Sequence, residues 1–96
     1  MMKVEKMTIN LNDFQNINDI HDYIARELNF PKYYGKNLDA LYDMLSTYIS
    51  NIEIRIYGIS DIDGKYADDV NAMLDMFEYL QDEDDNFKCF VDDYEL

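Results

Sequence analysis

The alternation of apolar and polar residues is clearest in the stretch IEIRIYG, residues 52–58. Isoleucine occupies every second position, which predicts a strand with one buried face, and Gly58 ends it. Residues 7–11 alternate in the same way, and the apolar run at residues 87–91 predicts a third strand. These three stretches define the predicted sheet.

Apolar residues at helical spacing predict three helices around these strands. In the first, Asn18 is the expected N-cap, Asp19 lies in the first turn, and the helix ends before Pro31. Gly35 is free to adopt a positive φ, and Asn37 suits the N-cap of a second helix. The inward stripe of this helix is formed by Leu38, Leu41, Leu45 and Ile49. The third helix starts at residue 65 and ends in the segment DEDDN, residues 82–86.

Strands that alternate with helices favour a parallel sheet with right-handed crossovers. The predicted fold class is therefore α/β, a three-stranded parallel sheet packed by three to four helices. A chain of 96 residues with 48% hydrophobic content supports one core, so residues 1–96 form a single domain. Its core spans about residues 7–91 and is followed by an acidic tail at residues 92–96.

The charge of the chain makes a basic protein its natural partner, and solubility explains the C-terminal acids, considered alone, equally well. The formal net charge is −13, and residues 61–96 hold 13 acidic and 2 basic residues against 8 and 6 in residues 1–60. Phosphates of nucleic acids or anionic membranes would be repelled by such a chain. The single cysteine, Cys89, lies in an apolar run that indicates an inert buried thiol. No signal peptide or membrane span is visible in the sequence, and we therefore expect a cytoplasmic protein.

The residues available for catalysis or for metal binding are few. The chain has one histidine, His21, whose position on the first helix favours a core role, and it has no glycine-rich phosphate loop. Residues 59–70 resemble part of a calcium loop, but Ile59 and Val70 stand where that loop needs carboxylates. We therefore expect no cofactor, no metal and no catalytic residue.

The second predicted helix carries two aspartates, Asp39 and Asp43, four residues apart. Such a like-charge pair costs about 0.2–0.5 kcal/mol in an isolated helix. The N-terminal dipole accounts for Asp39 but not for Asp43. Tyrosines flank the pair at positions 33, 34, 42 and 48, and tyrosine is enriched at binding hot spots. An acidic solvated face bordered by tyrosines is also ordinary, so the pattern alone leaves both interpretations open.

The segment PKYYGKNLDALYD, residues 31–43, resembles the enzyme-binding segment of the barstar family of intracellular ribonuclease inhibitors. The run NDIH at residues 18–21 and Phe77 are also similar to family positions. The resemblance implies a three-stranded parallel sheet and inhibition by occlusion of the active site. It implies that Asp43 replaces a substrate phosphate, Asp39 pairs with a second basic residue and Tyr33 stacks on the catalytic histidine. Asn37 and the Gly35 backbone would supply hydrogen bonds and close approach.

The chain also departs from the family pattern. Tyr42 and Tyr48 stand in place of tryptophans, Tyr79 stands where an acidic contact is common, and Lys32 and Lys36 add positive charge to the loop. With these substitutions, the expected partner-binding set is Tyr33, Gly35, Asn37, Asp39, Tyr42, Asp43, Ser46, Tyr48 and Tyr79.

The expected partner is a basic extracellular ribonuclease, bound 1:1 by a chain that is a monomer when free. One alternative is an immunity or interaction module that binds a different basic toxin or regulatory protein through the same face. Another is a hydrolase that uses the carboxylates of Asp39 and Asp43, and loss of turnover in Asp43→Asn would be needed to support it.

Overall fold

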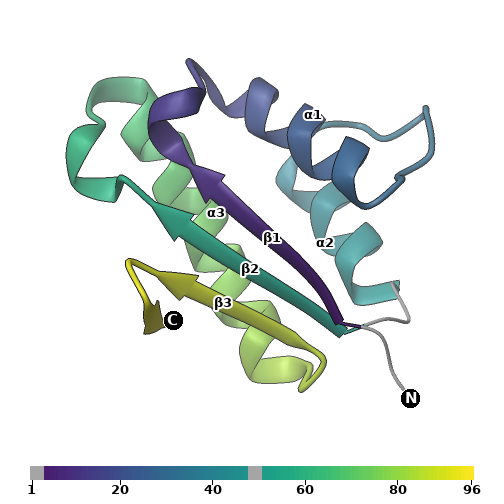
Figure 1. Ribbon diagram of the computed structural model, residues 1–96. Helices are drawn as coiled ribbons and strands as arrows, with labels where there is room; N and C mark the ends of the chain where they lie inside the picture. The colour runs from purple at the N-terminus through teal and green to yellow at the C-terminus, as the bar shows by residue number, and fades with distance from the viewer. Residues whose placement is uncertain (1–3, 48–50) are drawn as a thin grey trace.

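The computed structural model describes residues 4–47 and 51–96 and has a central sheet in the order β1-β2-β3-β4 (Figure 1). Strands β1 (Val4–Asn10), β2 (Asn51–Tyr57) and β3 (Phe87–Val91) are parallel, as predicted. Strand β4 (Tyr94–Glu95) pairs antiparallel with β3. The prediction of three strands is therefore correct for the parallel part and wrong for the whole sheet.

Strand β4 occupies the segment that was predicted to be an acidic tail. Asp92 and Asp93 have φ angles of 50° and 71°, and Val91 pairs with Tyr94 across them. A two-residue hairpin turn with positive φ at both central positions matches the twist of the strands, and aspartate tolerates this conformation better than most residues. The backbone N–H of Leu96 then donates to the carbonyl of Cys89 at 2.9 Å. Residues 92–96 are thus part of the sheet rather than a tail.

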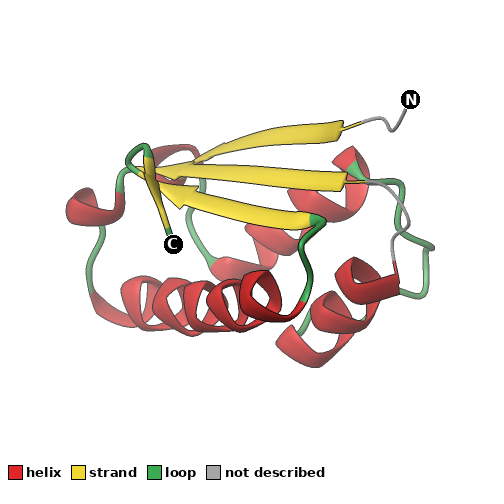
Figure 2. Ribbon diagram, turned by 90° about the horizontal axis from the view of Figure 1, so that it is seen from below, coloured by secondary structure: helices red, strands yellow, loops and turns green. Residues whose placement is uncertain are grey.

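Helices α1 (Ile17–Glu27), α2 (Leu38–Thr47) and α3 (Gly64–Glu83) all lie on the same face of the sheet (Figure 2). Short 3₁₀ helices occupy Leu11–Asp13 and Ile59–Asp61. Helices α1 and α2 form the crossover from β1 to β2, and α3 forms the crossover from β2 to β3. Gly58, with φ 92°, ends β2 as expected. The α/β class with helices packed on a sheet is confirmed.

The start of α1 differs from the prediction. The side-chain oxygen of Asn16, not of Asn18, accepts a hydrogen bond from the backbone N–H of Asp19 at 3.0 Å. The helix begins at Ile17, whose side chain packs against the core, and this places Asn18 inside the first turn. Asp19 lies in the first turn, as expected, where the helix dipole favours its charge.

The hydrophobic core lies between the sheet and the helices. Alternate residues of the strands point into it, including Ile52, Ile54 and Ile56, each no more than 2% exposed. The rings of Phe77 on α3 and Phe87 on β3 pack with centroids 5.5 Å apart. Cys89 is fully buried, as predicted, and burial raises the pKa of its thiol to about 12.

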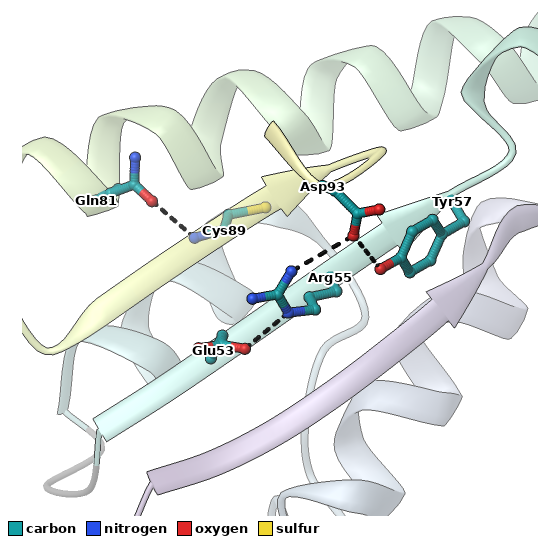
Figure 3. Close-up of polar contacts among 6 residues, drawn as sticks. All are labelled: Glu53, Arg55, Tyr57, Gln81, Cys89 and Asp93. Carbon is teal, nitrogen blue, oxygen red and sulfur yellow. Dashed lines mark hydrogen bonds and ion pairs between the residues drawn. The ribbon is translucent and has the colours of Figure 1, made fainter. Parts of the chain in front are cut away.

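The face of the sheet opposite the helices carries a polar network centred on Arg55 (Figure 3). Its Nε donates to Glu53 at 2.8 Å, and its guanidinium lies 4.2 Å from the centroid of Phe90. Asp93 in the β3–β4 turn accepts a hydrogen bond from the Tyr57 hydroxyl at 2.6 Å and lies 3.5 Å from Arg55. This network ties the hairpin to β2.

A second set of polar contacts ties the hairpin to α3 from inside the core. The side-chain oxygen of Gln81 accepts from the backbone N–H of Cys89 at 2.7 Å, as Figure 3 shows, and its amide nitrogen donates to the carbonyl of Leu96 at 2.6 Å. Both ends of this buried amide are therefore paired, as a buried polar group requires.

Candidate partner-binding surface

Helix α2 presents one apolar and one acidic stripe. It begins with the predicted cap, in which the side-chain oxygen of Asn37 accepts from the backbone N–H of Ala40 at 2.8 Å. Leu41 and Leu45 are buried at 0% and 2% exposure. Asp39, Asp43 and Ser46 are exposed, and their spacing of four and three residues places them along one face of the helix. The predicted acidic face is thus formed by these three residues.

The two aspartates of this face have no partner among the described residues. Neither carboxylate forms a hydrogen bond or an ion pair with any residue in the described part of the chain. Lys36, the cation nearest in sequence to Asp39, is bound instead to Asp22 of α1 with its Nζ 2.7 Å from Oδ1. Exposed carboxylates without an internal partner keep their full capacity to accept hydrogen bonds from another molecule. The surface therefore offers negative charge that the fold does not use.

Ser46 is engaged within its own helix. Its hydroxyl donates to the backbone carbonyl of Asp43 at 3.3 Å, and the hydroxyl of Thr47 donates to the same carbonyl at 2.7 Å. These contacts leave the Asp43 carboxylate untouched.

The adjacent tyrosines of the α1–α2 loop (residues 28–37) have opposite environments. Tyr33 is 81% exposed, as a contact residue would be. Tyr34 is 7% exposed: its ring packs edge-on against Phe30, and its hydroxyl lies 2.6 Å from Nδ1 of His21, which is 2% exposed. Tyr34 therefore belongs to the core rather than to the binding surface, and the core role expected for His21 is confirmed.

The backbone of this loop is unusual beside Gly35. Gly35 does not use its freedom to adopt a positive φ, whereas the neighbouring Lys36 has a φ of 54°. Gly35 matters for another reason, since a Cβ there would lie 3.1 Å from the side-chain nitrogen of Asn37. That nitrogen donates to the Gly35 carbonyl at 3.3 Å. Both ends of the Asn37 side chain are therefore used to shape the loop.

The end of α3 adds a residue that sequence reasoning missed. Tyr42 of α2 is half-buried and donates from its hydroxyl to Oε2 of Glu83 at 2.7 Å. The ring of Tyr79, 54% exposed, lies 6.0 Å from the ring of Tyr42. Hydrogen bonds from Tyr79 and from Tyr42 lower the pKa of Glu83 below its usual value, and the bond to Glu83 raises the pKa of Tyr42 to about 12.

Glu83 therefore holds a fixed negative charge beside the acidic face of α2. Its spacing of four residues from Tyr79 signals a shared face of α3, but the contact with Tyr42 spans 41 positions of the chain. Only the tertiary structure brings these residues together.

The remaining expected contact, Tyr48, lies outside the described residues. A half-open cavity of about 210 Å³ lies behind the loop and is lined by residues that include His21, Lys36 and Asp69. Asp39 and Asp43 are not part of its lining, and both side chains are exposed to solvent. This placement suits contact with a macromolecule better than enclosure of a hydrolase substrate.

Two further observations describe the chain at residues 4–47 and 51–96. No cluster of three histidine, cysteine or acidic side chains there has a geometry that could hold a metal ion. No helix in those ranges combines the length and the apolar character that crossing a membrane requires.

The fold and the surface together define a small α/β domain whose second helix presents unpaired carboxylates next to exposed tyrosines. Comparison with known proteins gives the family. The family model described as "Barstar (barnase inhibitor)" matches residues 4–92. A Bacillus subtilis (strain 168) protein named "Putative ribonuclease inhibitor YrdF" is 36% identical over 94 residues, which cover 93% of this chain and 100% of that protein. The chain belongs to the barstar family.

Proposed function

We propose that this protein inhibits a basic ribonuclease by placing α2 and the α1–α2 loop in the active site of the enzyme. The observation that carries the proposal is the pair of exposed, unpaired carboxylates of Asp39 and Asp43 on one face of α2. A ribonuclease binds the phosphates of RNA with cationic side chains, and a carboxylate is an acceptor for the same donors. The inhibitor then acts by occlusion, and no bond is made or broken.

Asp43 is the residue proposed to replace a substrate phosphate. It lies in the middle of the outer face of α2, and no ion pair with the residues at 4–47 and 51–96 has to be broken before it binds. Charge-assisted hydrogen bonds in a site that excludes water are among the strongest in proteins, and loss of one partner chiefly raises the dissociation rate. Asp39 and Glu83 are proposed to meet cationic side chains at the rim, where charges mainly tune association.

The tyrosines supply contact area in this proposal. Tyr33, which is 81% exposed, has a ring available to stack on a side chain of the enzyme. Tyr42 and Tyr79 hold Glu83 in place and contribute the exposed parts of their rings. Contact with the Gly35 backbone requires close approach, which a residue without a side chain permits.

The proposal is tested by titrating barnase activity with the purified protein, using barnase as the probe enzyme. Excess protein is expected to abolish RNA cleavage with a 1:1 end point, and Asp43→Asn is expected to weaken this inhibition strongly. The matched control is Glu95→Gln on β4, which removes the same charge from an exposed residue on the far side of β3 from α2 (Figure 1). If excess protein leaves cleavage by barnase and by other guanyl-type ribonucleases unchanged, the proposal is wrong.

A second candidate is a module that binds a different basic toxin or regulatory protein through the same face. Tyr79 favours it, because this exposed residue stands where the family often has an acidic contact, and so does the exposed Lys32. Lys36 favours it less, since Asp22 neutralises its charge. A pull-down that returns a basic partner without ribonuclease activity, and loses it in Asp43→Ala, would support this candidate. For either candidate, the cytoplasm is the proposed location of the inhibitor.

A further inference from the structure

Helix α1 is joined to the α1–α2 loop by two contacts from neighbouring residues. The buried contact joins Nδ1 of His21 to the hydroxyl of Tyr34 at 2.6 Å. The exposed contact joins a carboxylate oxygen of Asp22 to Nζ of Lys36 at 2.7 Å. The two loop residues flank Gly35, and Tyr34 directly follows the exposed Tyr33. The part of the loop proposed to enter the enzyme is therefore held at two points.

The loop between these points is not in a conformation that the chain prefers by itself. Lys36 has a φ of 54°, in the left-handed region that residues with a side chain seldom occupy. The loop also contains a turn in which the backbone N–H of residue 34 donates to the carbonyl of Pro31 at 3.0 Å. Strained backbone persists where surrounding contacts hold it, and here these contacts come from α1.

The buried contact is sensitive to the protonation of His21. The Tyr34 hydroxyl keeps its proton because burial raises its pKa, and it can donate to Nδ1 in the neutral tautomer of His21 that carries its proton on Nε2. An imidazolium has no acceptor nitrogen. From that tautomer, protonation of His21 would turn the hydroxyl away from Nδ1 and leave a buried O–H without an acceptor.

Charged groups on all sides of His21 affect this balance. Asp22 on the same helix favours the imidazolium, Lys36 in the loop opposes it, and Asp69 of α3 lines the same cavity as His21. Burial is the largest effect and lowers the pKa of His21 below 6.5.

We propose that His21 and Asp22 are positioning residues for partner binding, which touch no partner atom themselves but fix the α1–α2 loop through Tyr34 and Lys36. This inference rests on the proposed function for its effect on binding. Its effect on the loop of the free protein does not depend on any partner. The buried contact is the stronger of the two, since an exposed ion pair is screened by water and salt.

The first test measures the rate constants of barnase binding for the wild type, Tyr34→Phe and a control, Tyr23→Phe. Tyr23 is on the same helix, and its hydroxyl donates to the backbone carbonyl of Thr8 on β1 at 3.0 Å, away from the loop. Tyr34→Phe is expected to raise the dissociation rate about five-fold, the worth of one hydrogen bond, and Tyr23→Phe less than about two-fold. Equal effects of the two variants would overturn the proposal.

The second test uses the pH profile, which a merely structural role would not move. The dissociation rate is measured from about pH 7.5 down to the pH at which NMR shows His21 of the wild type protonated, for the wild type and for His21→Gln, whose side-chain oxygen accepts a hydrogen bond at every pH. Titration of barnase itself contributes equally to both. The wild type is expected to accelerate in acid about five-fold more than His21→Gln. Parallel profiles would refute a positioning role for His21.

The third test separates failure of this inference from failure of the proposed function. In the free protein, hydrogen exchange of the backbone amides at positions 34 and 40 is compared with that of the β2 amides, which report an intact fold. Exchange at positions 34 and 40 is expected to be about five-fold faster in Tyr34→Phe and unchanged in Tyr23→Phe, with β2 unchanged in both. If the wild type does not bind barnase but this result is obtained, the proposed target is wrong and the positioning role stands. Unchanged exchange at both positions would refute the positioning role.

Discussion

Replacement of Asp43 by asparagine is predicted to have opposite effects on binding and on stability. In the free protein, the carboxylate forms no hydrogen bond or ion pair with the described residues, so its removal leaves no group unpaired. It does remove the repulsion from Asp39 one turn away, which is about 0.2–0.5 kcal/mol. The free energy of unfolding should therefore rise by up to about 0.5 kcal/mol, equivalent to about 1–4 °C in Tm for a domain of this size.

Binding to the ribonuclease should change far more and in the other direction. Loss of one partner from a buried, hydrogen-bonded charge pair weakens the binding free energy by about 2–5 kcal/mol. Barstar-family complexes are among those from which this range is known. This corresponds to a Kd increase of about 30-fold to several thousand-fold. The cost arises on the enzyme, whose cationic side chains would be left buried against a neutral amide.

The two effects are measured on the same purified samples. Thermal unfolding followed by circular dichroism gives the stability change, and inhibition of barnase at a series of protein concentrations gives Kd. Glu95→Gln again controls for the loss of one negative charge, and its Kd should change by less than about three-fold. A Kd for Asp43→Asn within that same range would refute the role of Asp43. A loss of more than about 1 kcal/mol of stability would instead mean that the carboxylate supports the fold.

Three further predictions concern other parts of the molecule. Burial lowers the pKa of His21 below 6.5, so at acid pH the unfolded chain takes up a proton that the folded protein resists. Stability should therefore fall as the pH drops below 6.5, by at most about 1.4 kcal/mol per pH unit. Urea unfolding of His21→Gln should show a smaller loss of stability over the same pH range. Asp93→Ala removes the contacts with Tyr57 and Arg55 and places alanine at a turn position with φ 71°. The free energy of unfolding, measured with urea, should therefore fall by about 1–2 kcal/mol. An unchanged urea midpoint would contradict the role of this network. Because the net charge is −13, the association rate constant with a basic enzyme should fall as salt rises from about 0.05 to about 0.5 M. If stopped-flow measurements give the same rate constant at both salt concentrations, the acidic residues of α3 and of the hairpin contribute no electrostatic steering.

The regular elements could be predicted because their patterns repeat over many residues. Alternating isoleucines in β2 and the apolar stripe of α3 each offer several agreeing positions. Strand β4 offers only Tyr94 and Glu95, and its turn uses two aspartates that resemble a solvated tail. A pairing of two residues has no period to detect, so the hairpin was missed.

The candidate surface divides in the same way. Asp39 and Asp43 could be placed on one face of α2 from their spacing alone. Sequence could not separate Tyr33 from Tyr34, because the difference depends on the buried His21, whose Nδ1 lies 2.6 Å from the Tyr34 hydroxyl. Glu83 could not be found either, since its contact with Tyr42 joins two helices across 41 positions. Residues positioned by their own helix are visible in a sequence, and residues positioned by another element are not.

The location of α2 within the crossover from β1 to β2 has a consequence for folding. Val4 pairs with Asn51 and Asn10 with Tyr57, so each pair in this register joins residues 47 positions apart, and the loop that it closes contains α2 and the α1–α2 loop. Long loops of this kind make folding slow and cooperative. A partner that binds α2 at a concentration of about 1,000 times Kd would add about 4 kcal/mol to the stability of the native state. That stabilisation should spread through the crossover to the strands that it joins, so the amides of β1 and β2 should exchange more slowly in the complex than in the free protein.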